Sequence, residues 1–332
     1  MFSCCDRPSV SVHTAIRRAM SVDFTKLKSF VKIVDAGSVS RAASILRTAQ
    51  PALSQQVAAL ESHFKHKLLT RSNTGITPTE AGLVLYRHAQ LLLKQIEQAK
   101  IDIDSSSKSL AGRVSIGLAT YSTSSALSLP ILKEMKALHP QIIVHINDSF
   151  GHVLSELIMT GRMDMAIIYG SEPIKGVTLR PLFREELFLV SPPGTVFEKS
   201  RTESLPLSAL ADVPLLLPSK GHFLRRLIDE SLARARVVPN VVSEIESVSS
   251  LGAAVMDGLG STILPASVAA GASSFAGADI RRLARPVIEA TVSLCTSDHL
   301  PLSEPALAVR SVLLDVVEKL MRKHPQGIRS AP

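Results

Sequence analysis

The sequence predicts an α/β protein with a small helical amino-terminal unit, one long helix, and a larger carboxy-terminal part. Three observations carry this prediction. Residues 23–80 show helical apolar spacing interrupted by short turns and followed by a hairpin pattern, residues 81–110 show one long helical repeat, and residues 111–325 alternate strand-like with helix-like segments.

The composition excludes several classes of protein. At 332 residues the chain exceeds the usual size of one domain, and its 45% hydrophobic content is too high for a disordered chain. No apolar run approaches the roughly 18 to 20 residues that cross a bilayer. Its three cysteines suit neither a disulfide framework nor a standard zinc spacing. We therefore expect a cytoplasmic protein with no metal, no cofactor and no membrane contact.

The positive charge is concentrated near the amino terminus. Residues 1–110 contain 15 Lys and Arg against 8 Asp and Glu, a balance of +7, whereas residues 111–332 contain 22 against 21, a balance of +1. Such an asymmetry is typical of a module that binds a polyanion, with a neutral remainder free for another task. Residues 1–22 lack a periodic apolar pattern and are expected to be a disordered extension, with Met20 an alternative start of translation.

Three helices are expected in the amino-terminal unit. The first carries apolar residues from Leu27 to Val34 and ends at Gly37, and Ser38 can cap the second. The third starts near Gln50, because Pro51 is tolerated in a first turn. Its outward face is polar but uncharged, and its side chains suit the edges of DNA bases better than a merely solvated face would. The members of this face are Pro51, Ser54, Gln55 and Ala58.

The segment after the third helix is rich in turn-forming residues. It runs from Thr70 to Pro78 between residues that favour β-structure, so we expect a hairpin, or wing. Arg71 would place its charge near DNA phosphates, although a single loop arginine is often only solvated.

These motifs together resemble the DNA-binding domain of the LysR-type transcriptional regulators. The motifs are Gly37-Ser38, Ala42-Ala43, Ala49 through Gln56, Leu60-Glu61, and Thr77 through Gly82. The resemblance implies a winged helix-turn-helix with Gln50, Pro51, Ser54 and Gln55 in the major groove and Ser38, Ser40 and Arg71 near phosphates. Many members have a wing arginine where this chain has Thr74. Residues 30–35 and 50–57 are most similar to the regulators of nitrogen assimilation within that family.

A long helix is expected after a cap at Thr79. Its apolar residues recur at steps of four, three, four, three and four, as in a coiled coil, which favours dimerisation over packing on its own small domain. The members of this seam are Leu85, Ala89, Leu92, Ile96, Ala99 and Ile103. A symmetric dimer, or a tetramer, would bind a roughly palindromic site.

Residues 111–325 read as two series of strands and helices. The expected strands are 114–118, 142–146, 165–169, 186–191, 215–217, 238–244, 261–264 and 290–295, and the expected helices are 127–138, 153–160, 223–235, 248–257 and 305–323. The resemblance to LysR-type regulators covers this half too. It implies an effector-binding domain that resembles periplasmic binding proteins, with lobe I at about 113–178 and 283–323 and lobe II at about 179–282.

Hydroxyl side chains open several of these helices. Ser122 and Thr123, Ser219, and Ser247 follow strands and precede helices, where backbone N–H groups favour an anion or a polar ligand, although each could be a simple helix cap. By resemblance they surround the cleft between the lobes. We therefore expect these residues to bind a small polar or anionic effector, if the protein has one.

Two other functions remain as alternatives, a solute-binding protein and an enzyme on a two-lobed scaffold. The first would need a secretion signal in place of the basic helices, and the second would need clustered reactive side chains. Gly258 and Gly260 lack the third glycine of a nucleotide loop, and no catalytic pattern occurs. We therefore expect a regulator that activates or represses promoters, with RNA polymerase as a further partner, and not an enzyme.

Overall fold

The computed structural model describes residues 23–72, 75–104, 110–196, 204–323 and 327–331. The chain forms two compact units, an amino-terminal unit up to Lys100 and a carboxy-terminal unit from Ile101. The extension 1–22 and Thr74 lie outside the described residues. Within those residues, no helix is both long and apolar enough to cross a membrane.

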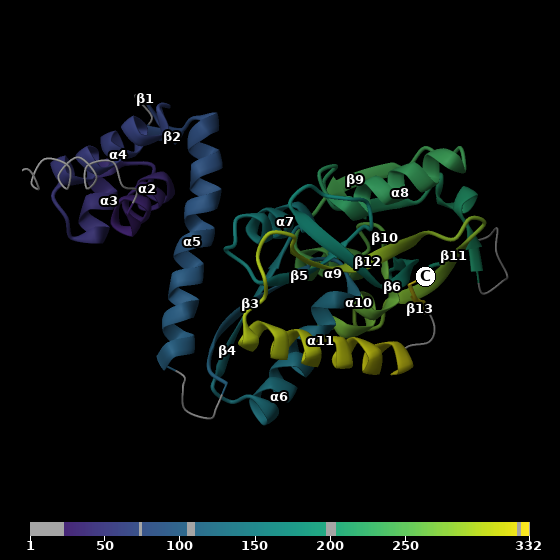
Figure 1. Ribbon diagram of the computed structural model, residues 1–332. Helices are drawn as coiled ribbons and strands as arrows, with labels where there is room; N and C mark the ends of the chain where they lie inside the picture. Colours follow the sequence, from purple (N-terminus) through teal and green to yellow (C-terminus); the bar gives the residue numbers. More distant parts are fainter. Residues whose placement is uncertain (1–22, 73–74, 105–109, 197–203, 324–326, 332) are drawn as a thin grey trace, which may run out of the picture. The chain divides into compact units, whose positions relative to one another are not determined.

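The amino-terminal unit contains the three helices and the wing that the sequence predicts (Figure 1). Gly37 ends the first helix in the left-handed region with φ 63°, and the Ser38 side chain caps the second by accepting from the Arg41 N–H. The core is built around Phe30, Ile33 and Leu53. Its elements are α2 (Phe24–Ala36), α3 (Val39–Leu46), α4 (Gln50–Phe64), β1 (Leu69–Ser72) and β2 (Gly75–Pro78).

The long helix α5 (Glu80–Asp104) begins where the sequence predicts. Thr79 Oγ1 accepts from the Gly82 N–H at 3.0 Å, which caps the first turn. A Cβ atom on Gly82 would lie 2.0 Å from the carbonyl oxygen of Leu68, so only glycine permits this approach to the strand. The Tyr86 hydroxyl donates to Asp35 and ties α5 to α2.

The carboxy-terminal unit is built on a nine-stranded mixed sheet. Its first half is β3 (Gly112–Ala119), α6 (Ser128–Leu138), β4 (Ile142–Ser149), α7 (Gly151–Met159) and β5 (Met165–Tyr169), joined by β12 (Glu289–Ser297) and α11 (Glu304–Lys323). Successive side chains of β5 point to opposite faces of the sheet. Met165 and Ile167 pack in a hydrophobic cluster with α6 and α11 on one face, and Ile168 packs in a second cluster with α7 on the other face. The helices therefore cover both faces of the strands (Figure 1).

The central strand β6 (Val177–Ser191) is longer than the 186–191 segment expected from the sequence. The sequence pattern did not predict the first part of this strand, because Pro181 and several charged residues are more typical of a loop. Pro181 is accommodated at a bulge, where the register against β12 shifts between Val292 and Ser293.

Strand β6 also crosses the expected boundary between the lobes at residues 178/179. It pairs with β12 up to Glu186 and with β10 (Thr262–Pro265) from Leu187 onward, so the change of partner lies well past that boundary. Strand β11 (Asp279–Ala284) also pairs with β6, and the expected return to the first lobe at about residue 283 stays a prediction. One strand is thus long enough to serve both halves of the sheet.

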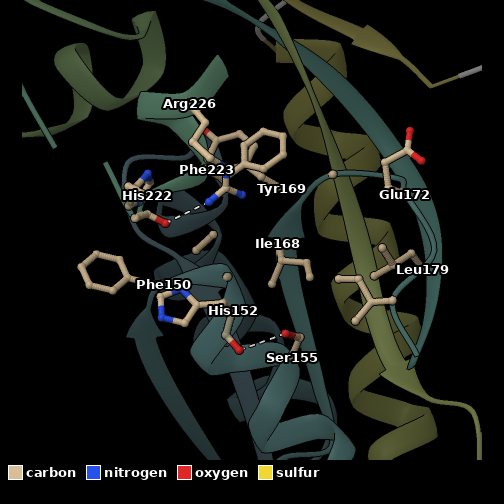
Figure 2. Close-up of a pocket in the computed structure, with 15 residues that line it drawn as sticks. Phe150, His152, Ser155, Ile168, Tyr169, Glu172, Leu179, His222, Phe223 and Arg226 are labelled. Atoms are coloured by element: carbon tan, nitrogen blue, oxygen red, sulfur yellow. Dashed lines mark hydrogen bonds between the residues drawn. The ribbon is translucent and has the colours of Figure 1, made fainter. Parts of the chain in front are cut away.

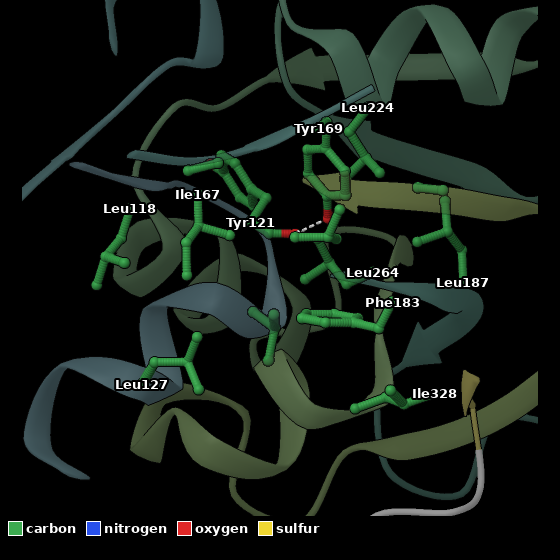
Figure 3. Packing of buried hydrophobic residues seen from close by; sticks show 14 of the residues in the cluster. Leu118, Tyr121, Leu127, Ile167, Tyr169, Phe183, Leu187, Leu224, Leu264 and Ile328 are labelled. Carbon is green, nitrogen blue, oxygen red and sulfur yellow. Dashed lines mark hydrogen bonds between the residues drawn. The ribbon is translucent and has the colours of Figure 1, made fainter. Parts of the chain in front are cut away.

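The second half carries several short elements that the sequence pattern did not predict. These are β7 (Ser204–Pro206), α10 (Ala266–Gly271), β11 and β13 (Ile328–Ser330). The expected elements are present as β8 (Pro214–Leu217), α8 (Phe223–Arg234), β9 (Asn240–Glu244) and α9 (Val248–Met256). Figure 3 shows the core where the two halves meet, with Tyr169, Phe183, Leu187 and Leu264 in one buried cluster.

Candidate functional sites

The exposed face of α4 is the first candidate site. Leu53, Val57 and Leu60 are buried, as the sequence predicts, and this turns Pro51 and Gln55 to the surface while Ser54 stays half-buried. Ala49 precedes the helix and gives it no side-chain cap. Pro51 has no N–H, and the Ala52 and Leu53 N–H groups donate to the Ala49 carbonyl oxygen at 3.0 and 3.3 Å.

Two residues expected to act separately, Ser40 and Gln50, are joined by a hydrogen bond. The Ser40 hydroxyl of α3 donates to Gln50 Oε1 at 3.2 Å. This contact orients the Gln50 amide at the start of α4, with its N–H₂ group still able to donate. Ser38, expected near phosphates, also caps α3, so its hydroxyl has a structural role in addition to any DNA contact.

The wing is anchored to the turn between α2 and α3. The Ile76 N–H donates to the carbonyl oxygen of Gly37 at 2.9 Å. A Cβ atom on Gly75 would stand 2.8 Å from that same oxygen, so the close approach requires glycine. Arg71, opposite Ile76 in the hairpin register, is exposed. The anchored wing thus holds Arg71 on the surface of the unit.

The expected dimerisation seam of α5 divides into two parts. Leu85 packs on the core of the amino-terminal unit, and Ala89 is fully buried there. Leu92 is 49% exposed and Ile103 is 74% exposed, and Ile96 and Ala99 also retain accessible surface. Because Ala89 has no accessible surface, a partner helix would contact the later seam positions.

The turn after β3, which we call the hydroxyl turn (Ser122–Ser124), is buried. Both expected effector residues in it, Ser122 and Thr123, lie at 1% exposure or less. The Thr123 N–H donates to Glu185 Oε2 at 3.1 Å, and the Thr123 hydroxyl bonds to Ser267 of α10. The backbone of this turn thus already binds a carboxylate of the chain itself.

Glu185 is the centre of this buried network. Its side chain has no exposed surface, and its other oxygen is hydrogen-bonded to the Tyr169 hydroxyl. The same hydroxyl lies 2.8 Å from the Tyr121 carbonyl oxygen (Figure 3). Burial raises the pKa of the carboxyl group, and hydrogen bonds from Thr123 and Tyr169 counteract the rise. Strand β6 therefore places the Glu185 carboxyl group against the hydroxyl turn, where the sequence predicted that an external anion would bind.

The other two expected effector residues lie elsewhere. The Ser219 N–H donates to Glu246 Oε1 at 3.1 Å. Ser247 is exposed, caps α9 by accepting from the Ser250 N–H, and contacts the Ser249 hydroxyl at 2.9 Å. An effector role for these four serine and threonine residues stays a prediction.

Among the described residues of the carboxy-terminal unit, two cavities bear on a ligand site. The smaller, about 190 Å³, is lined by Ser122 and Thr123 together with residues of α9 and α10. The larger, about 600 Å³, lies between the ends of β4 and β5 and the start of α8 (Figure 2). We call the larger one the aromatic cavity because Phe150, Tyr169 and Phe223 line it.

Comparisons with known proteins decide the family. Residues 107–318 match the family described as "LysR substrate binding domain", and residues 24–83 match "Bacterial regulatory helix-turn-helix protein, lysR family". The chain belongs to the LysR family of bacterial transcriptional regulators. The resemblance found in the sequence motifs is thereby confirmed, and so are the expectations of a regulator with a DNA-binding helix-turn-helix and not of an enzyme.

Curated relatives of this LysR-type regulator include the nitrogen assimilation regulatory protein nac from two bacteria. The Klebsiella aerogenes protein is 38% identical over 298 residues, which cover 90% of this chain and 96% of that protein. The Escherichia coli K12 protein is 38% identical over 296 residues, which cover 89% and 95%.

Solved structures of LysR-type regulators share the fold. Full-length OxyR from Pseudomonas aeruginosa superposes with a TM-score of 0.69 at 25% identity, covering 90% of this chain and 95% of that chain. CbnR in complex with its target DNA gives a TM-score of 0.62 at 21% identity, covering 90% and 99%. The expected architecture of a helix-turn-helix followed by a two-lobed α/β domain is confirmed.

The LysR fold brings together functional candidates that sequence reasoning missed. Phe150, Tyr169, Phe223 and Arg226 come from three separate elements and line one cavity, while Glu185 fills the hydroxyl turn. The sequence did not predict the buried role of Glu185, because an acidic residue in a charged segment is usually expected to be exposed to solvent. Only the pairing of β6 places it in the core.

Proposed function

We propose that this LysR-type regulator controls promoters of nitrogen metabolism from the cytoplasm. The observation that carries the proposal is the 38% identity, over nine-tenths of the chain, to two nitrogen assimilation regulatory proteins. Whether it activates or represses then depends on where its sites lie relative to each promoter.

DNA contact is proposed for the exposed start of α4 and for the wing. Gln50, Pro51, Ser54 and Gln55 would contact base edges, since this accessible face of α4 carries no charged side chain and its Gln and Ser side chains can both donate and accept. Ser38, Ser40 and Arg71 would contact phosphates. The Ser40–Gln50 hydrogen bond places these two proposed DNA contacts side by side at the start of α4.

A homodimer or homotetramer is proposed as the DNA-binding form. The exposed Leu92 and Ile103 and the half-buried Ile96 of α5 support it, because a helix with such an apolar stripe buries the stripe by pairing with another helix. Two copies of α4 then require a roughly palindromic site, and RNA polymerase is the proposed further partner at the promoter.

The experiment that tests the function is recovery of the genomic fragments bound by the full-length protein. The expected result is enrichment of roughly palindromic sites beside genes for ammonia assimilation or for the use of alternative nitrogen sources. A matched preparation of the variant in which both Ser54→Ala and Gln55→Ala are introduced should lose that enrichment. Fragments without any nitrogen-related neighbour would contradict the pathway, and identical fragments for the variant would contradict the DNA-contacting residues.

A further inference from the structure

The first turns of α5 pack closely against the rest of the amino-terminal unit. A Cβ atom on Gly82 would collide with the Leu68 carbonyl oxygen, and the Ala89 side chain has no exposed surface. Leu85 packs on the same core, which α2 and α4 provide. Apolar burial has no preferred direction, so these contacts stabilise the pairing of α5 with the unit more than they fix the rotation of α5 about its own axis.

A hydrogen bond adds the missing direction. The Tyr86 hydroxyl in the second turn of α5 donates to the Asp35 carboxylate in the last turn of α2. The Tyr86 ring packs against the core of the unit, whereas Asp35 is exposed. At 100° per residue Tyr86 lies about 60° around the helix from Ala89, beside the buried line rather than on it. A hydrogen bond to a charged acceptor is directional, so this one opposes both rotation and tilting of α5.

The expected dimer seam lies farther along the same helix, which is continuous (Figure 1). Ile96 of that seam follows Tyr86 by ten residues, so at 1.5 Å per residue it lies about 15 Å farther along the axis. A tilt of about 10° at Tyr86 would therefore displace α5 at Ile96 by about 2.5 Å. Both copies in a symmetric dimer tilt alike, so their α4 helices would shift relative to each other by up to about 5 Å, whereas successive base pairs are about 3.4 Å apart.

A shift of this size matters for binding to two half-sites. Side chains such as Gln55 can determine which bases each α4 contacts, but they do not determine the distance between the two copies of α4. A displacement of one base pair would move such a side chain from one base to the next, where its hydrogen bonds no longer match. The stiffness of the junction between α5 and α2 therefore sets how strictly the protein distinguishes one half-site spacing from another.

We propose that the Tyr86–Asp35 hydrogen bond fixes the half-site spacing that this regulator prefers. Tyr86 is a positioning residue, which acts through α5 on the distance between two copies of α4. This inference rests on the proposed function, in which a dimer paired along α5 binds two half-sites. It assigns to the junction a specificity for spacing that is separate from the base specificity of α4.

The test measures binding of the full-length protein to duplexes made from the genomic fragment that the wild type enriches most. One series lengthens or shortens the spacer between the half-sites by one or two base pairs, and a further duplex carries a single half-site. We expect the wild type to bind the natural spacing about tenfold or more tightly than the altered ones. Tyr86→Phe keeps the ring and removes the hydroxyl. It should reduce this preference to about threefold or less and leave affinity for the single half-site within about twofold.

Variants of the acceptor test the same contact from α2. Asp35→Ala should broaden the spacing preference as Tyr86→Phe does, and the double variant should be no broader than either, because both substitutions break one interaction. Asp35→Asn should retain more of the preference, since its amide oxygen still accepts a hydrogen bond. Sedimentation should show that all of these variants are dimers.

The matched control is Glu80→Gln, which removes an exposed carboxylate from the first turn of α5 and so makes the same change in charge as Asp35→Asn. It should keep the wild-type spacing preference. An unchanged preference in Tyr86→Phe, an equal loss of affinity for the single half-site and for the pair, or a wild type indifferent to spacing would each overturn the proposal. The fragments and the dimeric state of the wild type test the proposed function by themselves, so its failure is distinguishable from a failure confined to Tyr86→Phe.

Discussion

The two units of this regulator present their polar residues in opposite ways. In the amino-terminal unit Gln50, Pro51 and Gln55 are on the surface, positioned by a single helix whose other face is buried. In the carboxy-terminal unit Ser122 and Thr123 are buried and bonded to partners far away in the sequence. The residues proposed to contact DNA bases lie on one helix, so neighbouring residues in the sequence determine that surface. The surroundings of a buried side chain depend instead on residues that are distant in the sequence and adjacent only in the folded protein.

The strongest test of the comparison is Glu185→Ala, which removes the buried acceptor. The Thr123 N–H and the Tyr169 hydroxyl would each lose a partner, and a cavity would remain, so unfolding of the carboxy-terminal unit should become easier by about 3 to 5 kcal/mol. Denaturant unfolding of the full-length protein measures this. Glu185→Gln, which keeps the shape, should cost less. A loss below about 1 kcal/mol for Glu185→Ala would show that the network is not structural.

The amino-terminal counterpart is Leu92→Glu in α5. A carboxylate at a buried dimer seam costs several kcal/mol, so the dimer should dissociate and specific DNA binding should weaken about a hundredfold or more. Sedimentation and footprinting would detect both effects. Gln95→Glu, at an exposed position of the same helix, serves as the control. A dimeric Leu92→Glu variant that footprints normally would contradict the seam.

The pH dependence of stability distinguishes the two units as well. His222 Nδ1 accepts from the Leu224 N–H and so must be unprotonated in the folded state, and burial lowers its pKa to about 4 from 6.5. The unfolded chain therefore binds more protons between pH 6.5 and 4, and stability is lost as the pH falls through this window, by about 3 kcal/mol from this group.

The measurement is the difference in unfolding free energy between wild type and His222→Asn at pH 7 and pH 4.5. Asparagine can keep the cap without titrating, so the variant should lose less stability on acidification. The raised pKa of Glu185 acts in the opposite direction in both proteins and cancels in the difference. Parallel pH profiles for the two proteins would refute the assignment to His222.

A smaller effect is expected for Gln55→Ala and Ser54→Ala on the exposed face of α4. Each should reduce discrimination between specific and altered sites by about 1 to 3 kcal/mol. Because Gln55 is exposed, its removal should change the stability of the unit by less than about 0.5 kcal/mol. Footprints on single-base variants of the site measure discrimination. An unchanged site preference would mean that another element reads the sequence.

The smallest expected change is in the salt dependence of Arg71→Ala. Loss of one phosphate contact should reduce the slope of log affinity against log salt by about 1, and it should weaken specific and random DNA alike. Binding titrations at several salt concentrations measure the slope. Arg87→Ala, an exposed position on α5, provides a comparison outside the wing. A slope that does not change would remove Arg71 from the interface.

The sequence by itself determined the amino-terminal unit almost completely. The end of α2 at Gly37, the Ser38 cap and the start of α4 at Gln50 depend on neighbouring residues, so local patterns predict them. The strands and helices around the first part of the carboxy-terminal sheet follow apolar patterns of the same local kind. The family also followed from these residues, because each of its motifs is a short contiguous stretch of the chain.

Only the tertiary structure decided what surrounds the predicted hydroxyls. Pro181 and its charged neighbours gave no sign that β6 is one continuous strand, and therefore no sign that Glu185 reaches the hydroxyl turn. The aromatic cavity likewise joins Phe150 with Phe223, which follow different strands. The physical reason is common to both. A helix surface is fixed by a period of 3.6 residues, whereas a cavity is fixed by strand register and strand order, which depend on pairing between distant segments.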